Sequence, residues 1–425
     1  MPSDPSLNAM RTAAPADLAI LRGPEGVETA AAAEWEGMTL GQALDRCCAR
    51  WGEKELLVFP ERRFTACALA AEAERFARGL LHLGVARGEH VAVWLPNLPE
   101  YVVAEFALAR LGAAMVPVNL RYKTSELEYV LRQSDSTTLL LHPQLFDIDF
   151  LSLLRKVCPE IDRGPAGQLR CRALPWLRRV ITLGEPAPGL LPYQDVLRLG
   201  DQPELAGPLR ERESEVTPDS VVLLQYTSGT TAFPKAVMLA HGQVLRNAFQ
   251  MAGRAGIGPE DRVLSVMPMF HVGGSVCALL GSVAMGYSLY LGPKFDAAET
   301  LRLIEQERIT TYIGLEAMFL ALRHHEDFSR RSRALLVKGW AAGTSALLRM
   351  VAEEIGIRNI CSLYGLSEAS PNVCIADWRD PYEKRIETMG RPQPGVEVKV
   401  IDPANGATLR RGERSRLADF ASEVL

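Results

Sequence analysis

Hydroxyl-bearing side chains crowd into residues 227–231, where three threonines and one serine surround the flexible Gly229. The apolar run at residues 221–225 predicts a strand that ends in this turn. Side-chain O–H and backbone N–H groups that converge after a strand make the cradle that a nucleotide polyphosphate needs. Lys235 adds a point charge on a long stem, which suits the β- and γ-phosphates. The residues predicted to bind phosphate are Thr227, Ser228, Gly229, Thr230, Thr231 and Lys235.

The same turn also has a simpler interpretation. Turns rich in Ser, Thr and Gly are common on protein surfaces. Neither GxxxxGK[ST] nor GxGxxG, the two widespread phosphate-binding patterns, occurs in the chain. The composition of the turn therefore leaves two interpretations open, a phosphate cradle and an ordinary polar turn.

Residues 226–237 read YTSGTTAFPKAV and resemble the phosphate-loop signature of the adenylate-forming (AMP-binding) superfamily, Y-T-S-G-T-T-G-x-P-K-G-V. This superfamily includes acyl-CoA synthetases, adenylation domains of peptide synthetases, and luciferases. The chain departs from the pattern at Ala232 and Ala236, where the family has glycine. An alanine methyl would strain the loop only if these positions need a positive φ angle, and we expect that they do not.

Residues 268–274 read PMFHVGG and resemble the P-x-F-H-x-x-G segment of the same superfamily. The resemblance implies that His271, Val272 and Gly273 line the pocket for the acyl group. A lone histidine is more often a buried structural residue, so His271 takes this role from the resemblance alone.

Residues 364–368 read YGLSE and resemble the superfamily's Y-G-x-T-E segment. The resemblance implies that the Tyr364 ring packs on adenine, that the Ser367 hydroxyl meets the α-phosphate, and that Glu368 binds Mg²⁺. Together with Lys235, Ser367 and Glu368 are therefore the expected catalytic residues.

Two looser matches complete the series. Residues 339–345 occupy the place of the small-residue segment beside the adenine, which implies that Gly343 and Thr344 line it. Residues 390–395 read GRPQPG and resemble the G-R-P-x-P-G stretch that leads into the next subdomain. The resemblance covers residues 38–413 in all.

The resemblance implies an acid–CoA ligase (acyl-CoA synthetase). Such an enzyme uses ATP and Mg²⁺ to turn a carboxylic acid, here fatty or aromatic, into an acyl-adenylate, and then uses CoA as co-substrate to form an acyl-CoA. Two alternatives remain open, an amino-acid adenylation domain and a non-catalytic protein that binds a nucleotide or an acyl group. An amino-acid-activating domain needs an aspartate near the start of its pocket, and none stands between Met269 and Leu291.

The resemblance stops after Glu413, and residues 414–425 match nothing in the pattern. In the superfamily a small C-terminal lid domain follows, and its lysine reaches the reacting carboxylate. We hypothesise that a frameshift or a premature stop truncated a longer coding sequence. Since losing one preorganised donor costs about 10²–10³ in rate, we expect an impaired enzyme that binds ATP, adenylates weakly and forms no thioester efficiently.

The elements that must position these residues alternate between helix and strand. Leu69, Ala73, Phe76, Leu80 and Leu83 recur at helical spacing, and Gly84 follows them as a C-terminal cap. Short apolar runs predict buried strands at residues 90–95, 114–118, 263–267 and 287–291. This order predicts an α/β fold whose mostly parallel sheets are covered by helices.

The predicted domain organisation follows from these patterns. An acyl-activating domain (38–395) holds two parallel-sheet α/β subdomains, with a linker near residues 160–215. Residues 396–400 alternate between apolar and polar, which predicts an antiparallel strand at the beginning of a β-barrel subdomain (396–425). Residues 1–37 are predicted to be a loosely ordered lead-in.

Composition narrows the class of protein. The 425 residues include 47 Lys and Arg against 51 Asp and Glu, so the net charge of −4 argues against a sequence-independent nucleic-acid binder. Eight cysteines without CxxC spacing predict mostly buried thiols in a reducing cytoplasm, rather than disulfides or metal ligands. Residues 272–291 carry no charge, but their glycines favour a buried helix and strand over a membrane span. We expect a cytoplasmic protein acting on a small carboxylic acid, with a homodimer forming through the unpaired edge of the last strand.

Overall fold

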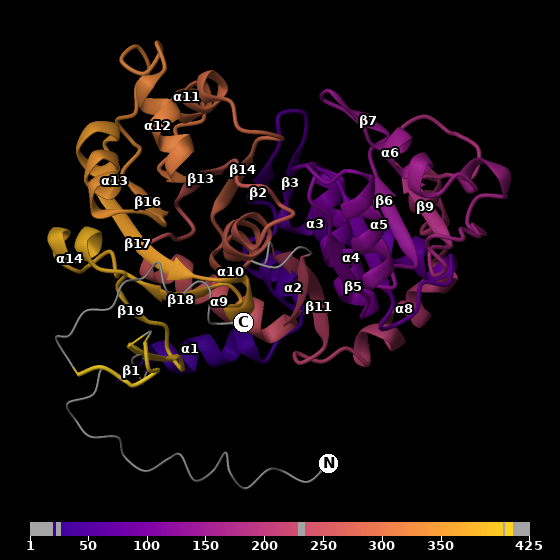
Figure 1. Ribbon diagram of the computed structural model, residues 1–425, viewed down its shortest axis with the longest axis horizontal. Coiled ribbons are helices and arrows are strands. Elements are labelled where there is room, and N and C mark those ends of the chain that lie inside the picture. Colours follow the sequence, from indigo (N-terminus) through magenta and orange to yellow (C-terminus); the bar gives the residue numbers. More distant parts are fainter. Residues whose placement is uncertain (1–19, 23–26, 228–233, 403, 411–425) are drawn as a thin grey trace, which may run out of the picture.

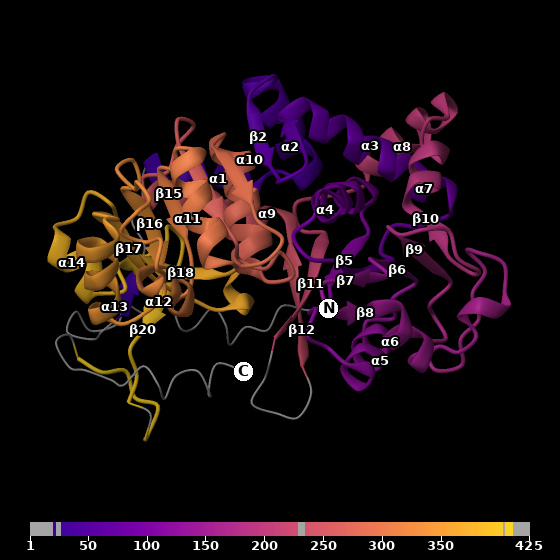
Figure 2. The same ribbon diagram turned by 90° about the horizontal axis from the view of Figure 1, so that it is seen from above.

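The computed structural model describes residues 20–22, 27–227, 234–402 and 404–410. Within these ranges, two large sheets form the frame of the molecule, and Figures 1 and 2 show them beside one another. Parallel strands make up the centre of each sheet, which confirms the predicted α/β class.

The first sheet has seven strands in the order β10-β9-β6-β4-β5-β11-β12. Their bounds are β4 (His90–Trp94), β5 (Ala114–Pro117), β6 (Thr138–Leu141), β9 (Arg179–Thr182), β10 (Leu191–Pro192), β11 (Val221–Thr227) and β12 (Lys235–Ala240). Neighbouring strands are parallel except for β11 and β12, which form an antiparallel pair at one edge. Figure 2 shows this pair at the boundary with the second sheet.

The second sheet has nine strands in the order β19-β18-β17-β16-β15-β13-β14-β2-β3. Their bounds are β2 (Glu55–Val58), β3 (Arg63–Thr65), β13 (Arg262–Ser265), β14 (Ser288–Leu291), β15 (Thr311–Ile313), β16 (Lys338–Ala341), β17 (Asn359–Gly365), β18 (Asn372–Ile375) and β19 (Arg391–Pro392). The strands from β17 to β2 are parallel, while β18, β19 and β3 run antiparallel at the edges. A small hairpin of β7 (Gln144–Leu145) and β8 (Ile148–Asp149) stands apart from both sheets.

Helices cover both faces of the two sheets. The α-helices of the described chain are α1 (Val27–Glu36), α2 (Leu40–Trp51), α3 (Ala66–His82), α4 (Pro99–Leu111), α5 (Thr124–Gln133), α6 (Phe150–Val157), α7 (Tyr193–Leu199), α8 (Ala206–Ser214), α9 (His241–Arg254), α10 (Gly281–Met285), α11 (Ala297–Gln306), α12 (Glu316–His324), α13 (Ser345–Met350) and α14 (Tyr382–Glu387). The 3₁₀- and π-helical turns are η3 (Ile161–Arg163), η4 (Pro203–Leu205), η5 (Gly273–Leu280), η6 (Val351–Ile355) and η7 (Ser367–Ala369).

The alternation of side chains along β4 shows how the layers are built. Val91 and Val93 belong to a large central core that also holds residues of α2, α3, α4, α9 and α10. Ala92 and Trp94 point to the opposite face and join an outer core with α5 and α6. A third core packs α11, α12 and α13 on the outer face of the second sheet. Because both faces of the central strands are buried, β4, β5 and β6 read as nearly continuous apolar runs.

Local sequence sets the bounds of α3, whose buried face and C-terminal glycine agree with the prediction, although the helix ends at His82 and Leu83 follows it. Thr65 caps its first turn by accepting a hydrogen bond from the backbone N–H of Ala68. Leu69, Ala73, Phe76 and Leu80 form its buried face. Gly84, just after its end, has a φ of +78°, the left-handed conformation expected of the cap.

The prediction of a loosely ordered lead-in is wrong for residues 20–22 and 27–36. The first of these ranges is β1 (Ile20–Arg22), which pairs antiparallel with β20 (Glu397–Lys399), and the second is α1. Trp35 stacks on Phe249 of α9 with ring centroids 5.7 Å apart, and α1 packs along α9. The alanine-rich sequence of α1 shows no strong amphipathic pattern, so it gave no sign of this helix. Packing against α9 holds the helix in place.

Two further domain expectations need correction. Residues 160–215 are no linker, because β9 lies inside the first sheet between β6 and β10. No closed barrel forms in the described chain. The predicted antiparallel strand near residue 397 exists as β20, but β1 pairs with it, so it does not lack a partner as we expected.

The cysteine prediction is confirmed for six residues and wrong for two. Cys47, Cys158, Cys171, Cys277, Cys361 and Cys374 are buried free thiols. Cys48 and Cys67 form a disulfide between α2 and the start of α3. These two cysteines are 19 residues apart in the chain, and only the packing of the two helices brings them together.

The uncharged stretch at residues 272–291 forms η5, α10 and β14, as a buried helix followed by a strand. Residues 273–284 are all buried within the central core or beside it. Among the described residues, no helix combines the length and the apolar character needed to cross a membrane.

Candidate active site

Four parallel strands of the second sheet end at the same edge. Ser265 of β13 pairs with Ile313 of β15, Ile313 pairs with Trp340 of β16, and Ala341 pairs with Ser362 of β17. The predicted acyl segment follows β13, and the predicted adenine segment and the YGLSE segment span the ends of β16 and β17. Ligands of open α/β sheets bind outside the carboxyl ends of such strands. The fold therefore collects three of the predicted segments at one edge.

The acyl segment is held by a buried asparagine of the other subdomain. The Asn97 side chain donates to the carbonyls of Met267 (3.0 Å) and Gly292 (2.9 Å) and accepts from the N–H of Met269 (2.8 Å). The Tyr101 hydroxyl donates to the carbonyl of Met269 at 2.7 Å. These contacts fix the segment between the two sheets.

Gln225 joins this segment to the predicted phosphate turn. Its amide nitrogen donates to the carbonyl of Phe270 at 3.1 Å, and the side chain is 2% exposed. Thr227, the last residue of β11, follows two positions later and is half-buried. The beginning of the phosphate turn therefore lies beside the acyl segment.

Within the acyl segment, His271 and Gly273 form a local turn. The Nδ1 atom of His271 accepts a hydrogen bond from the N–H of Gly273 at 3.2 Å. Although part of the residue is exposed, desolvation of its ring by the surrounding protein lowers the pKa of His271, so the ring is neutral near pH 7. Val272 and Gly273 are buried. A Cβ at Gly274 would lie 2.5 Å from the carbonyl oxygen of Pro268, so only glycine lets η5 begin this close to the segment.

A second buried amide clamp supports the YGLSE segment. Asn247 of α9 donates to the carbonyls of Asn372 (2.8 Å) and Ala369 (3.2 Å). Its oxygen accepts from the N–H (3.1 Å) and the side-chain amide (2.8 Å) of Asn372. A Cβ at Gly365 would lie 2.2 Å from the carbonyl oxygen of Pro371, so glycine is required there too. This clamp fixes η7, which carries Ser367 and Glu368.

The predicted catalytic residues lie on elements that touch. Lys235 begins β12 and pairs with Thr227 across the β11–β12 ladder. The turn η7 contacts β12. Lys235 and Glu368 are exposed, whereas Tyr364 and Ser367 are half-buried. Among the described residues, neither the Lys235 ammonium nor the Glu368 carboxylate has an ion-pair or hydrogen-bond partner.

The remaining predicted residues have mixed outcomes. Ser228, Gly229, Thr230 and Thr231 lie outside the described residues, as does Ala232. Ala236 pairs with Tyr226 in the ladder and is not among the residues with positive φ, which confirms that alanine is unstrained there.

The predicted adenine segment, residues 339–345, begins inside β16 and continues past its end. Gly343 and Thr344 are both exposed. Thr344 is the N-cap of α13, and its hydroxyl oxygen accepts a hydrogen bond from the N–H of Leu347 at 3.3 Å. Its side chain thus has a structural role, while the backbone before it remains accessible.

The sequence did not single out Asn97, Gln225, Asn247 or Asn372 as positioning residues. Each is an amide with at most 7% exposure. Asn97 follows the strand end HVAVWL-P, so its place after a buried strand was a visible signal. Nothing in the sequence pointed to the other three, because their partners are distant in the chain.

One cavity lies beside Asn97, between the loops that follow β2 and β4. It measures about 500 Å³ and is lined by Asn97 together with Phe59, Arg62, His142 and Phe146. Aromatic and charged groups share its wall, which suits an amphipathic ligand.

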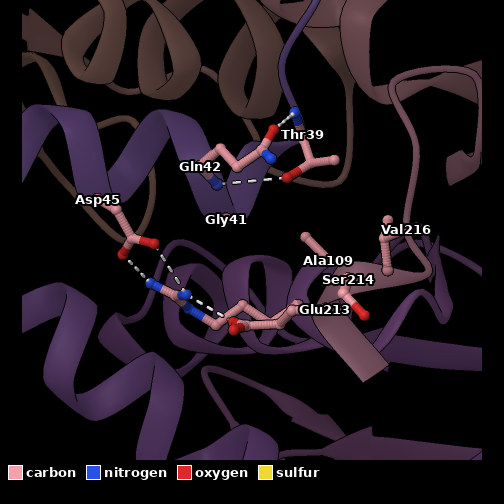
Figure 3. A pocket seen from close by; sticks show the side chains of 9 residues that line it. Thr39, Gly41, Gln42, Asp45, Ala109, Glu213, Ser214 and Val216 are labelled. Carbon is pink, nitrogen blue, oxygen red and sulfur yellow. Dashed lines mark hydrogen bonds and ion pairs between the residues drawn. The ribbon is translucent and has the colours of Figure 1, made fainter. Parts of the chain in front are cut away.

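Another pocket, of about 240 Å³, lies at the far end of α4 (Figure 3). Arg110, 6% exposed, sits at its base and is held by Asp45 and Glu213. Thr39 and Gln42 close the upper side with a capping box at the start of α2. Because two carboxylates already neutralise the one cation, this pocket is no anion site, and α4 separates it from the carboxyl edge of the strands.

Comparisons with known proteins agree with these motifs. A family model described as AMP-binding enzyme matches residues 44–417. A putative acyl-CoA synthetase of Bacillus subtilis (strain 168) is 32% identical over 392 residues, which are 91% of this chain and 71% of that protein. The mitochondrial medium-chain acyl-CoA ligase ACSF2 of Bos taurus is 30% identical over 378 residues, 87% of this chain and 62% of that ligase. The chain thus spans less than two thirds of the bovine protein.

Solved structures show the same architecture. An anthranilate CoA ligase in complex with anthranoyl-AMP matches with a TM-score of 0.77 and 26% identity, over 89% of this chain and 68% of that chain. A long-chain-fatty-acid-CoA ligase from Archaeoglobus fulgidus matches with a TM-score of 0.72 and 26% identity, over 89% of this chain and 73% of that chain.

Proposed function

Because the chain belongs to the AMP-binding enzyme family, we propose that it is an acid–CoA ligase that first activates a carboxylic acid with ATP. One observation supports this activity above the others. Lys235 and Glu368 are exposed, unpaired opposite charges on contacting elements of the described chain, beside the carboxyl ends of the strands. Unpaired charges at such an edge are available to a charged substrate.

In the proposed first step, an oxygen of the carboxylate forms a bond to the α-phosphorus of ATP. The bond from that phosphorus to the bridging oxygen breaks, and pyrophosphate leaves. Two anionic groups must approach, so positive groups and hydrogen-bond donors have to stabilise the phosphoryl oxygens. Lys235 would bind the departing β- and γ-phosphates, and the Ser367 hydroxyl would donate to the α-phosphate.

The Glu368 carboxylate fits a magnesium ligand. It is exposed and carries no competing ion pair within the described residues, and Mg²⁺ takes one or two carboxylates together with substrate phosphates. When bound, the ion would neutralise charge on the phosphates. Glu368 would hold the ion next to Lys235. The Tyr364 ring would pack on the adenine, with the backbone of residues 342–344 beside it.

The proposed acid is fatty or aromatic. His271 is neutral and Val272 and Gly273 are buried, so the wall of the segment offers no charge to an ammonium group. The apolar helix η5 continues directly from this wall into the core. Among the relatives, one acts on medium-chain acyl groups and one on anthranilate, as their names state.

ATP–pyrophosphate exchange over a panel of fatty, aromatic and amino acids tests the proposal. We expect exchange with a fatty or aromatic acid, and a loss of about 10²–10³ in kcat for Lys235→Ala and Glu368→Gln. Lys156→Ala and Glu211→Gln, which remove exposed charges on α6 and α8, are matched controls and should keep the wild-type rate. The absence of exchange with every acid, or equal rates for Lys235→Ala and Lys156→Ala, would overturn it.

Several narrower points are part of the proposal. Ser228, Gly229, Thr230 and Thr231 are proposed to complete the phosphate cradle. CoA is the proposed acceptor, which direct measurement of acyl-CoA formation tests separately from exchange. A cytoplasmic location and a homodimer are likewise proposals, to be tested by fractionation of cells and by light scattering after gel filtration.

A further inference from the structure

Two cysteines of the outer core lie together with a glutamate at the end of α6. The thiol sulfurs of Cys158 and Cys171 and a carboxylate oxygen of Glu160 all lie within 4.8 Å of one another. Cys158 caps the C-terminus of α6, Glu160 immediately precedes η3, and Cys171 lies in the irregular chain that leads to β9. Both thiols are buried and free.

The carboxylate of this cluster faces both thiols. Its Oε1 atom accepts a hydrogen bond from the N–H of Arg172 at 3.5 Å. Its Oε2 atom is buried, and the thiols of Cys171 and Cys158 are hydrogen-bond donors to the carboxylate. The two sulfurs and a carboxylate oxygen therefore surround one point, where a metal ion would take the place of the thiol protons.

The other free cysteines provide an internal comparison. Cys47, Cys277, Cys361 and Cys374 are also buried, yet none of them belongs to such a group among the described residues. Burial alone therefore does not distinguish Cys158 and Cys171 from the other thiols, whereas their hydrogen bonds to one carboxylate do. Two sulfurs and one oxygen are instead a donor set that Zn²⁺ accepts, with a water as the fourth ligand of a tetrahedron.

We propose that Cys158, Glu160 and Cys171 bind a zinc ion that fastens the segment between α6 and β9. This segment has few regular hydrogen bonds and is exposed over most of residues 162–168. Helix α6 packs on the outer face of the first sheet and runs from the carboxyl edge toward the opposite edge, so the cluster lies away from Lys235 and Glu368. The ion has a structural role, and its binding releases the two thiol protons.

Metal analysis and cobalt spectroscopy of the full chain test the proposal. We expect one zinc per chain after purification with Zn²⁺ under nitrogen, and thiolate-to-metal charge-transfer bands when Co²⁺ replaces it. Cys158→Ala and Cys171→Ala should abolish stoichiometric binding, and the size-conserving Glu160→Gln should weaken it more than about tenfold. Chelation should lower the Tm of the wild type and leave that of Cys171→Ala unchanged.

Matched controls separate this site from other thiols. Cys47→Ala removes a buried thiol of α2, and Cys48→Ala removes one half of the disulfide; both should keep the zinc and the cobalt bands. A reduced wild-type chain with neither zinc nor cobalt bands would overturn the proposal. Unchanged binding in both Cys171→Ala and Glu160→Gln would do the same, as would a Cys158–Cys171 disulfide that persists under nitrogen and excludes the metal.

Discussion

Replacing Glu105 with glutamine should make the protein more stable at alkaline pH. Glu105 lies in the middle of α4 with 0% exposure, and neither carboxylate oxygen has a hydrogen-bond partner among the described residues. Burial raises the pKa of Glu105 to about 8 from an ordinary value of 4.5. The folded protein therefore keeps this carboxyl protonated at neutral pH, whereas the unfolded chain ionises it.

The sign and size of the effect follow from proton linkage. A carboxyl whose pKa is raised in the folded state binds more protons there, so stability falls as pH rises from 4.5 to 8. The full shift corresponds to about 5 kcal/mol, of which about 3.5 kcal/mol falls between pH 5 and pH 8. Glu105→Gln removes this titration. The stability of the variant relative to the wild type should therefore rise by about 3.5 kcal/mol over that interval.

Urea unfolding followed by tryptophan fluorescence at pH 5, 6, 7 and 8 measures the difference. Glu126→Gln is the matched control, because hydrogen bonds from its own backbone N–H and that of Lys123 lower the pKa of Glu126. Its stability relative to the wild type should not rise with pH. If the Glu105→Gln difference stays flat from pH 5 to pH 8, the carboxyl ionises in the folded state and the reasoning fails. Tyr101, one turn earlier, holds Met269, so exchange activity in the variant also reports whether the acyl segment stays in place.

Three other predictions concern His241, which accepts a hydrogen bond from the N–H of Leu40, and two residues that hold the acyl segment. Burial lowers the pKa of His241 to about 4, so the free energy of unfolding should fall by about 3 kcal/mol as pH drops from 6.5 to 4. His241→Gln should lose this dependence in urea unfolding, and a pH profile parallel to that of the wild type would contradict the prediction. Asn97→Ala leaves the Met267 and Gly292 carbonyls without this donor and the Met269 N–H without its acceptor, so it should cost about 2–4 kcal/mol and raise the KM for the acid in pyrophosphate exchange. An unchanged KM would show that the acyl segment is fixed by other contacts. Gly274→Ala should destabilise by about 1–3 kcal/mol in thermal unfolding because its methyl meets the Pro268 carbonyl, whereas Gly207→Ala, which meets no atom within 4 Å, should be neutral or stabilising.

The sequence by itself determined the elements and the motifs. Apolar runs and helical spacing depend on neighbours a few residues away, which is why β4, β5, α3 and β14 lie close to where they were predicted. The phosphate turn, the acyl segment and the YGLSE segment are likewise continuous in the chain, so their residue types alone predicted their chemistry. The acyl and YGLSE segments share an edge because the strands of a parallel sheet end on the same side, whereas the phosphate turn follows β11 of the other sheet.

The tertiary structure alone decided how these pieces are held. Asn97 reaches a carbonyl 170 residues away, and Asn247 reaches one 125 residues away, so neither amide carries a local signal. The partner of β20 is β1, from the opposite end of the chain, and residues 160–215 join a sheet although their composition resembles a linker. The zinc cluster proposed here also depends on a turn that folds Cys171 back onto Cys158. Hydrogen bonds and metal ligands act over a few ångströms in space whatever their separation in sequence, and the packing of the chain sets which groups come that close.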